Sequence, residues 1–223
     1  MIRVFGKLAF AVAIFLGTTS GVRAQIKITI DRNVGSEATP AFRFEHVPAP
    51  AKDSAAASAK LALVVGEGDG NGAGLKALID GILPSSADSP GANFFFDAGT
   101  LGGRFRLDLG SSIEIAQINT YSWHPDTRGP QVYNLYASDG SSPDFNPAPD
   151  GNTHPVSCGW KLIASVDTRP KQGELGGQYG VSISDPGGII GKYRYLLFDC
   201  GETETVDDFG NTFYSELNVI TKK

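Results

Sequence analysis

Two neighbouring stretches decide the fold: Gly103-Arg-Phe-Arg-Leu-Asp-Leu-Gly-Ser-Ser-Ile-Glu-Ile-Ala-Gln-Ile-Asn-Thr-Tyr121 and Arg128-Gly-Pro-Gln-Val-Tyr-Asn-Leu-Tyr-Ala-Ser-Asp-Gly140. In the first, Phe105, Leu107 and Leu109 alternate with polar neighbours, which is the period of a strand with one buried face. The second ends in Asp139-Gly140, a dipeptide that favours a tight turn. This region therefore predicts short antiparallel strands joined by turns.

The same pattern extends over most of the chain. Short apolar runs separated by Gly, Pro, Asp and Ser clusters cover residues 61–65, 94–96, 105–109, 113–121, 132–138, 160–166, 181–184, 193–198 and 213–220. In the last run, alternation places Phe213 and Leu217 on one face and Tyr214 and Glu216 on the other. Glycine is abundant, at 28 of 223 residues, and the one expected helix is short, at about 74–78. We therefore expect an all-β, antiparallel sandwich of one domain.

The first 24 residues predict a secretory signal peptide. Arg3 and Lys7 precede the apolar run Leu8-Ala-Phe-Ala-Val-Ala-Ile-Phe-Leu16, and Val22-Arg23-Ala24 forms a small-residue boundary. The apolar run has about half of the ~20 residues that a spanning helix needs. We expect cleavage after Ala24 and a mature chain that is secreted or periplasmic, with no membrane span.

The remaining chain divides into an N-terminal extension and a main domain. Residues 25–60 contain one alternating strand at 25–31, a second short strand at about 41–47, and a connector at 53–60 with one helical turn capped by Asp53 or Ser54. We expect this extension to pack on the main domain, residues 61–223. Without residues 1–24 the chain has 16 basic and 24 acidic residues, because three basic and no acidic residues are removed. An acidic chain without a basic cluster is a poor partner for nucleic acid.

Catalytic motifs are scarce. The glycine-rich segment 66–74 partly resembles a dinucleotide-binding loop and partly, through Asp69, Asn71 and Asp80, a calcium-binding loop; a flexible turn is the plainer interpretation. The three histidines do not have the spacing of a zinc site, and no nucleophile elbow occurs after residue 24. We therefore expect no organic cofactor and no catalysis.

Two cysteines, Cys158 and Cys200, lie after the signal peptide and would meet an oxidising compartment. The even count favours a disulfide between them, and two separate buried thiols are the alternative.

Five segments in order resemble the discoidin, or coagulation-factor type C, family of the galactose-binding-like superfamily. They are Leu78-Ile-Asp-Gly81, Asp108-Leu-Gly110 with Ile115 to Ile118, Tyr133 to Gly140, Trp160-Lys-Leu-Ile163, and the pair Tyr193 to Phe198 and Tyr214 to Val219. The resemblance covers residues 65–220 and implies a jelly-roll sandwich. The extension, the long loop 141–157 and the lack of a terminal cysteine pair depart from the family pattern.

The resemblance also directs attention to loops at one end of the sandwich, where family members bind sugars, phospholipid headgroups or proteins. In loop 121–128, Trp123 would offer a stacking face for a pyranose, and His124, Asp126 and Arg128 would supply hydrogen-bonding groups. Packing of Trp123 on the sandwich edge is the alternative. A second loop contributes Phe209 and Asn211, and Tyr179 is a further exposed-aromatic candidate.

The family also implies one structural calcium ion. Its ligands here would be Asp80 and Glu216, with Asp88 or backbone carbonyls of 77–86 completing the set, because hard cations take oxygen ligands.

Taken together, these patterns predict a secreted, non-catalytic module that binds carbohydrate or a glycosylated surface. Two alternatives remain: a structural protein that docks another secreted protein, and a hydrolase that acts through paired carboxylates. The sequence does not set the ligand's identity or the oligomeric state.

Overall fold

The computed structural model describes residues 25–222, so the expected signal peptide lies outside the described residues. Its strands are β1 (Lys27–Asn33), β2 (Lys60–Val65), β3 (Gly103–His124), β4 (Val132–Ser138), β5 (Lys161–Asp167), β6 (Gly177–Ser184), β7 (Gly191–Cys200) and β8 (Tyr214–Thr221). Single 3-10 turns are η1 (Gly35–Glu37), η2 (Ala55–Ser58), η3 (Leu75–Leu78), η4 (Pro90–Ala92) and η5 (Pro155–Cys158). Every strand pair is antiparallel. The prediction of an all-β antiparallel sandwich is therefore confirmed.

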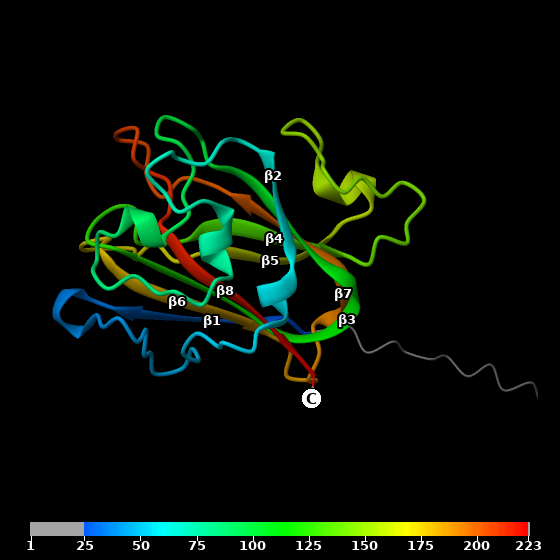
Figure 1. The fold of residues 1–223 in the computed structure, drawn as a ribbon, viewed down its shortest axis with the longest axis horizontal. Helices are drawn as coiled ribbons and strands as arrows, with labels where there is room; N and C mark the ends of the chain where they lie inside the picture. Colours follow the sequence, from blue (N-terminus) through cyan, green and yellow to red (C-terminus); the bar gives the residue numbers. More distant parts are fainter. Residues whose placement is uncertain (1–24, 223) are drawn as a thin grey trace, which may run out of the picture.

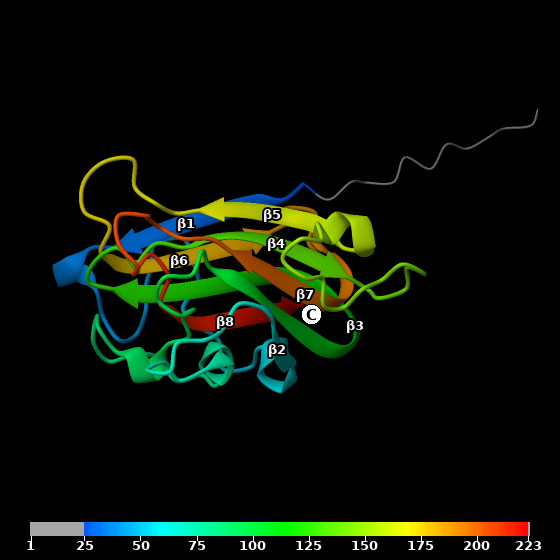
Figure 2. The same cartoon turned by 90° about the horizontal axis from the view of Figure 1, so that it is seen from above.

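One long strand, β3, belongs to both layers of the sandwich (Figures 1 and 2). Its first half pairs with β2 and β7, and β7 pairs in turn with β4, giving the layer β2-β3-β7-β4-β5. Its second half pairs with β6 and β8, giving the layer β1-β6-β3-β8. The register shifts between Asp108 and Ile113, and Gly110 there takes a positive φ of 82° that favours glycine. The two expected strands at 105–109 and 113–121 are thus one strand bent at this glycine.

The core lies between the two layers, where each strand contributes alternate residues. From one layer come Phe105, Leu135 and Phe198, and from the other come Ile118, Val181 and Leu217; all are fully buried. Burial of this apolar surface is the main stabilising contribution, at roughly 25 cal/mol per Å². The triple Phe94-Phe95-Phe96 is buried as well, although it forms only isolated bridges rather than a strand.

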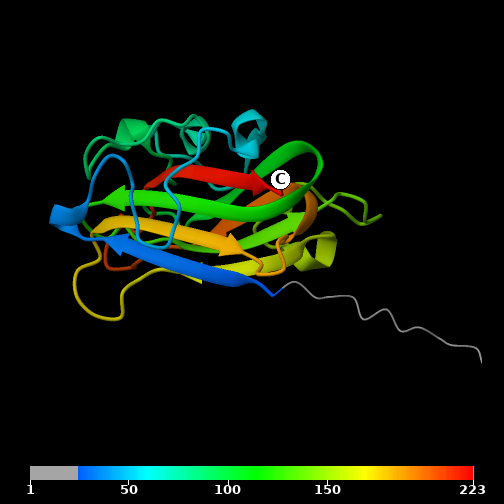
Figure 3. The same cartoon turned by 90° about the horizontal axis from the view of Figure 1, so that it is seen from below.

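The N-terminal segment packs on the layer that contains β6. Strand β1 runs beside β6 (Figure 3), and the pairing places Ile28 opposite Ile183. The expected strand at 41–47 is wrong, because Phe42 adopts a positive φ of 47° and the segment turns instead of extending. Its side chains still serve the fold, since Phe42 and Val47 form a small buried cluster outside the main core. Ser54 accepts a hydrogen bond from the Ala56 N–H and so caps η2, as expected.

A bulge changes the faces of the last strand. Tyr121 pairs with Glu216 and Ser122 with Tyr214, so Ser215 is an extra residue in β8. Tyr214 joins Leu217 in the core as a result, and Phe213 points away from it. The simple alternation predicted for 213–220 fails at this one position, with a consequence for the site described below.

The expected disulfide is also wrong, because both cysteines are free and buried. On β7, Cys200 shares the core face with Phe198, whereas Leu197 points to the opposite face. Cys158 packs with Leu197, Tyr136 and Trp160 on that opposite face. The strand itself therefore separates the two thiols.

Candidate functional site

Loops from distant parts of the sequence meet at the end of the sandwich where β3 passes into β4. The Phe213 N–H donates to the Arg128 carbonyl at 2.9 Å, and the Thr203 hydroxyl donates to the Thr127 carbonyl at 2.6 Å. On the neighbouring side, the Asp69 N–H donates to the Phe95 carbonyl at 3.0 Å. These contacts fix loop 125–131 against loop 201–213 and bring the glycine-rich loop to Phe95.

Arg128 is the central charged residue of this end. Its side chain lies against the stacked rings of Phe95 and Phe213, with Cζ 4.6 Å and 4.3 Å from the two ring centroids. Its Nε donates to the Asn211 carbonyl at 3.0 Å, whereas Nη2 is buried and has no hydrogen-bond partner. Only 8% of the residue is exposed, and burial lowers the pKa of the guanidinium from its ordinary value. The cation is thus held by aromatic rings and one carbonyl, and neither Nη1 nor Nη2 donates to a group among the described residues.

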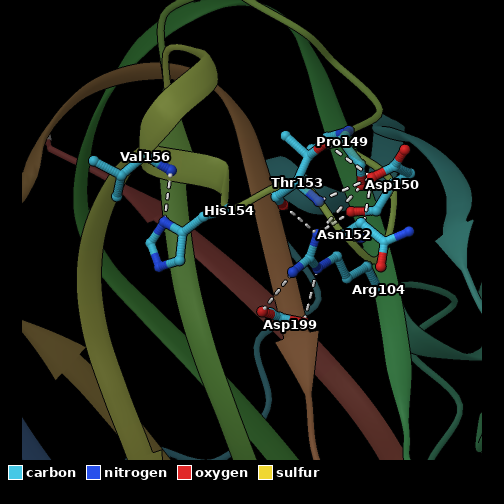
Figure 4. Close-up of polar contacts among 8 residues, drawn as sticks. All are labelled: Arg104, Pro149, Asp150, Asn152, Thr153, His154, Val156 and Asp199. Atoms are coloured by element: carbon cyan, nitrogen blue, oxygen red, sulfur yellow. Dashed lines mark hydrogen bonds and ion pairs between the residues drawn. The ribbon is translucent and has the colours of Figure 1, made fainter.

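A second buried arginine shows what a structural role looks like in this chain. Arg104, also 8% exposed, uses Nε and Nη2 in a bidentate pair with Asp199 at 2.8 Å and 3.2 Å (Figure 4). Its Nη1 donates to the carbonyls of Asp150 and Thr153 and holds the long loop 141–157 against the sheet. All three nitrogens of Arg104 have hydrogen-bond partners, which is the normal condition of a buried arginine. In Arg128 only Nε has one.

His124 lies beside Arg128 at the end of β3. Its ring meets Phe213 edge to face, with centroids 4.7 Å apart, and its Nδ1 accepts a hydrogen bond from the Asp126 N–H at 3.0 Å. Burial and the positive charge of Arg128 lower the pKa of His124. The ring is therefore neutral at pH 7, with its proton on Nε2, where it can serve as a hydrogen-bond donor.

The other predicted ligand residues have different positions. Phe209 is 52% exposed, and its ring centroid lies 5.7 Å from the Cζ atom of Arg128, so it presents an aromatic surface at the loop tip. Asp126 is exposed beside His124. Asn211 is buried, and its amide donates to the Asp97 carbonyl at 2.8 Å and to Thr100. Asn211 therefore shapes the loops around the site, and its Oδ1 is buried without a partner.

The expectation that Trp123 presents a stacking face to solvent is wrong. Trp123 is 6% exposed and meets Phe42 edge to face, with centroids 5.7 Å apart. Residues 123 and 124 point to opposite sides of β3, so Trp123 lies under the N-terminal segment while His124 faces Phe213. The alternative, packing on the sandwich, is the observed one. Tyr179 is likewise buried, and its hydroxyl donates to the Leu175 carbonyl.

Sequence reasoning missed the residues that hold Arg128. The apolar run 94–96 gives no sign of a contact with Arg128, and simple alternation places Phe213 on the same face as Leu217. The bulge at Ser215 turns Phe213 outward. No local sequence pattern predicts that bulge. Three consecutive phenylalanines, however, cannot all point to the same face of an extended segment, so one of them is expected to face away from the core.

The predicted calcium ligands divide into two groups. Asp80 and Glu216 line one pocket, and the Gly81 N–H and the Asn218 amide donate to the Glu216 carboxylate at 3.1 Å each. Burial, together with the charge of Asp80, raises the pKa of Glu216 to about 8. Asp88 instead acts electrostatically on His124 and Arg128 at the loop end. Asp88 is not among the residues that line this pocket, and within residues 25–222 no group of three or more acidic, His or Cys side chains is placed to hold a metal, so the further ligands from backbone carbonyls of 77–86 stay a prediction.

Nowhere in the described part of the chain does a helix reach the length and apolar character needed to cross a bilayer.

Comparison with known proteins finds similarity among solved structures only. No family model and no curated protein matches the chain. Similar structures include CBM32-1 from a family 31 glycoside hydrolase of Clostridium perfringens, with 13% identity, a TM-score of 0.46, and 76% of this chain and 99% of that chain covered. The family 32 CBM from C. perfringens NanJ in complex with galactose has 14% identity and a TM-score of 0.44, over 74% and 96% of the two chains. A Streptococcus pneumoniae fucose binding module, SpX-3, has 12% identity and a TM-score of 0.45, over 77% and 99%. The chain is also similar to part of SpGH29, with 12% identity and a TM-score of 0.46. This match covers 77% of this chain and 28% of the SpGH29 chain.

Proposed function

We propose that this chain is a non-catalytic carbohydrate-binding module that is exported from the cytoplasm. Its sugar site is the loop end formed by His124, Arg128 and Phe209. Export rests on the signal-peptide pattern of residues 1–24, which the structure does not describe.

The unused nitrogens of Arg128 carry the proposal: Nη2 is buried without a partner, and Nη1, which is not buried, also donates to no described group and is the nitrogen that a ligand can reach. A buried donor without a partner costs about 1–3 kcal/mol, so native structures rarely keep one unless something else satisfies it. A sugar hydroxyl or ring oxygen is such a partner, because it accepts hydrogen bonds and brings no charge of its own. Arg128 is held in place by two aromatic rings, so little side-chain freedom would be lost on binding.

The neighbouring groups suit the same ligand. The neutral His124 ring supplies a second donor, and the exposed Phe209 ring supplies a flat surface for the C–H face of a pyranose. These groups combine one aromatic face with donors on one side, which is how a site can fix both the position and the orientation of a sugar ring.

The proposal also includes a structural calcium ion, with a ligand set that does not contain Asp88. The residues that would hold it are Asp80 and Glu216 with nearby backbone oxygens, and Glu216 is a buried carboxylate without an ion-pair partner among the described residues. When bound, calcium would neutralise this carboxylate and tie loop 79–82 to β8.

The experiment is a glycan-array screen of the protein beginning at Gln25, followed by calorimetry with the best ligand. Phe209→Ala should weaken binding by about 1–3 kcal/mol, the range of an interface aromatic, and leave the melting temperature nearly unchanged because the side chain is exposed. Arg128→Met should abolish measurable binding. Val206→Ala is the matched control, since Val206 is 93% exposed in the same loop and should change neither property.

Two results would contradict the proposal. One is a screen with no glycan bound by a folded, monodisperse protein. The other is a ligand whose affinity is the same for the unmodified protein, for Phe209→Ala and for Arg128→Met, because that ligand would bind elsewhere.

A further inference from the structure

Strand β1 forms one edge of its layer, and its outer side is unpaired. All seven of its residues pair with β6 on the inner side, and the strand order of the sheet ends at β1. Among the described residues, no backbone hydrogen bond outside the β1–β6 ladder involves residues 27–33. Figure 3 shows β1 as the outermost strand of its layer. The outer side of β1 therefore carries backbone N–H and C=O groups that can accept another strand.

Apolar side chains reach this open edge. On β6, Ile183 pairs with Ile28 and Val181 pairs with Ile30, and both β6 residues are fully buried between the layers. Ile28 and Ile30 themselves are 36% and 43% exposed. The apolar face of the layer thus continues past β6 and meets solvent at β1. Exposed β-branched residues on an edge strand favour pairing with another strand.

The polar end of β1 is held by its own molecule. The Arg32 Nη2 donates to the Glu174 carbonyl at 2.7 Å, and its Cζ lies 5.2 Å from the centroid of the Tyr179 ring. The Asn33 amide donates to the Gln178 side chain at 3.0 Å. These partners belong to β6 or to the loop before it, so both side chains lean inward, away from the outer side of β1.

Lys27 and Asp31 lie on the other face of β1 and carry opposite charges. Lys27 is exposed and has no ion-pair partner among residues 25–222. The Asp31 carboxylate accepts the N–H groups of His46 and Val47, the second at 2.8 Å. Burial raises the pKa of Asp31, but these donors outweigh burial and the pKa is lowered overall. The carboxylate is therefore charged at pH 7.

A second copy of β1 matches this edge in one antiparallel register, with Thr29 facing Thr29 at the twofold axis. Ile28 of each copy then faces Ile30 of the other, which joins the two apolar rows. Lys27 of each copy faces Asp31 of the other, which brings opposite charges together twice. The strand is thus complementary to itself in both apolar and charged residues.

The neighbouring registers match less well. They differ by two residues, because facing residues of antiparallel strands share one hydrogen-bonding state. With Ile30 at the axis, Ile28 faces the charged Arg32. With Ile28 at the axis, Lys27 faces Thr29 and meets no negative charge. Self-complementarity therefore selects one occupant of the edge, a second copy of this chain, in one register.

We propose that the outer side of β1 is a homodimer interface, at which two copies pair antiparallel with Thr29 at the twofold axis. The layer β1-β6-β3-β8 of one copy then continues into that of the other as one sheet. Because β1 is antiparallel to β6 and β6 is antiparallel to β3, β1 runs in the direction of the second half of β3, which ends at His124. The loop ends of the two copies therefore point in opposite directions. This inference does not depend on sugar binding.

Cysteine cross-linking tests the register. Thr29→Cys should form an intermolecular disulfide under mild oxidation, because facing Cα atoms of antiparallel strands lie about 4.5–5.5 Å apart, within the range of disulfides. Lys27→Cys is the matched control on the same face of the same strand. In the proposed register its two copies are four residues, or roughly 14 Å, apart along the strand, so it should not cross-link. The unmodified protein should give no cross-linked product, because both native thiols are buried.

Sedimentation equilibrium of the protein beginning at Gln25, from micromolar to millimolar concentration, measures the association itself. The unmodified protein should show a monomer–dimer equilibrium. Thr29→Lys should weaken the dimer by about tenfold or more, because it places two like charges face to face at the axis. Asn152→Lys adds the same charge on the exposed loop 141–157 and should leave the dimer unchanged. Equal melting temperatures of dilute Thr29→Lys and unmodified protein would show that the variant folds.

Three results would overturn the inference. One is a protein that stays monomeric at millimolar concentration. Another is equal cross-linking of Thr29→Cys and Lys27→Cys, which would mean random collision or a different register. The third is a dimer that Thr29→Lys leaves intact, because that dimer would use another surface. None of these results bears on the proposed sugar site, which the glycan array tests separately.

Discussion

At the scale of single residues, the contrast between Arg104 and Arg128 is the most informative feature of the chain. Both are equally buried, and only Arg104 has a partner for each nitrogen. Residue type and burial therefore do not distinguish a structural arginine from the arginine proposed to bind a ligand. The distinction comes from counting donors and acceptors around each guanidinium.

Trp123→Ala should destabilise the protein by about 3–5 kcal/mol, because it removes a buried ring that packs against Phe42. Urea unfolding measures this directly, and Trp123→Phe should cost less. Glycan affinity, measured on the folded fraction, should be unchanged. A variant that keeps its stability but loses glycan binding would return Trp123 to the site.

Thiol titration of the denatured, unreduced protein should give two free thiols per chain. Cys158 and Cys200 face opposite sides of β7, so a bond between them would require the strand to be displaced. In the native protein both thiols should react slowly, because both are buried and burial raises the pKa of the Cys200 thiol to about 12. Fewer than two thiols after denaturation would show that the strands separate enough to let them pair.

At the scale of secondary-structure elements, period-two alternation correctly located most strands, and the errors share one cause. Alternation reports which residues are buried in a straight strand, but it cannot show where a strand bends or bulges. Two predicted strands are one strand bent at Gly110, and Phe213 changes face at the Ser215 bulge. Both errors come from backbone irregularities that tertiary pairing selects.

The same limit explains the result for the site. Three of the six predicted ligand residues, His124, Arg128 and Phe209, are brought together because the loop positions of this sandwich follow from the strand order. Trp123 is covered by the N-terminal segment, because a loop residue's exposure depends on what packs over it. Asn211 is buried and lies against Arg128, whose Nε donates to its carbonyl. The N-terminal segment that covers Trp123 lies about 80 residues away in sequence, beyond the reach of any local pattern.

The pairing of β3 with β7 near the bend should give the protein a measurable acid dependence. Arg194 on β7 donates to Asp108 on β3 through Nε at 2.8 Å and Nη2 at 2.9 Å, which lowers the pKa of that carboxyl. Because the pKa of Asp108 is lower in the folded than in the unfolded protein, its ionised carboxylate stabilises the fold above the unfolded pKa of about 3.9. This stabilisation is lost as the pH falls through the folded-state pKa. Asp108→Asn should therefore melt below the unmodified protein at pH 7, and the two should converge as the pH falls through the lowered pKa of Asp108 in the folded protein.

Thermal melting across pH measures this convergence. Asp144→Asn is the control, because that exposed carboxylate has no ion-pair partner among the described residues. A difference between Asp108→Asn and the unmodified protein that is constant with pH would assign the effect to packing instead of charge.

At the scale of the whole molecule, a ligand that binds only the folded state raises global stability by mass action. Calcium at Asp80 and Glu216 should do so by about 2.7 kcal/mol when present at a hundred times its dissociation constant. For a chain of this size each kcal/mol corresponds to roughly 2–4 °C in melting temperature. Melting in calcium and in chelator measures the shift, and Glu216→Gln should remove it. Identical curves for the unmodified protein in calcium and in chelator would exclude calcium from this pocket.

The length of β3 has a consequence for how the protein opens. Because its 22 residues are hydrogen bonded first to β7 and then to β6 and β8, neither layer can separate without breaking a strand that the other layer needs. The two layers are therefore one cooperative unit in thermodynamic terms. Backbone amides of Leu107 in one layer and Ile118 in the other should exchange with deuterium through the same global opening, with equal protection free energies.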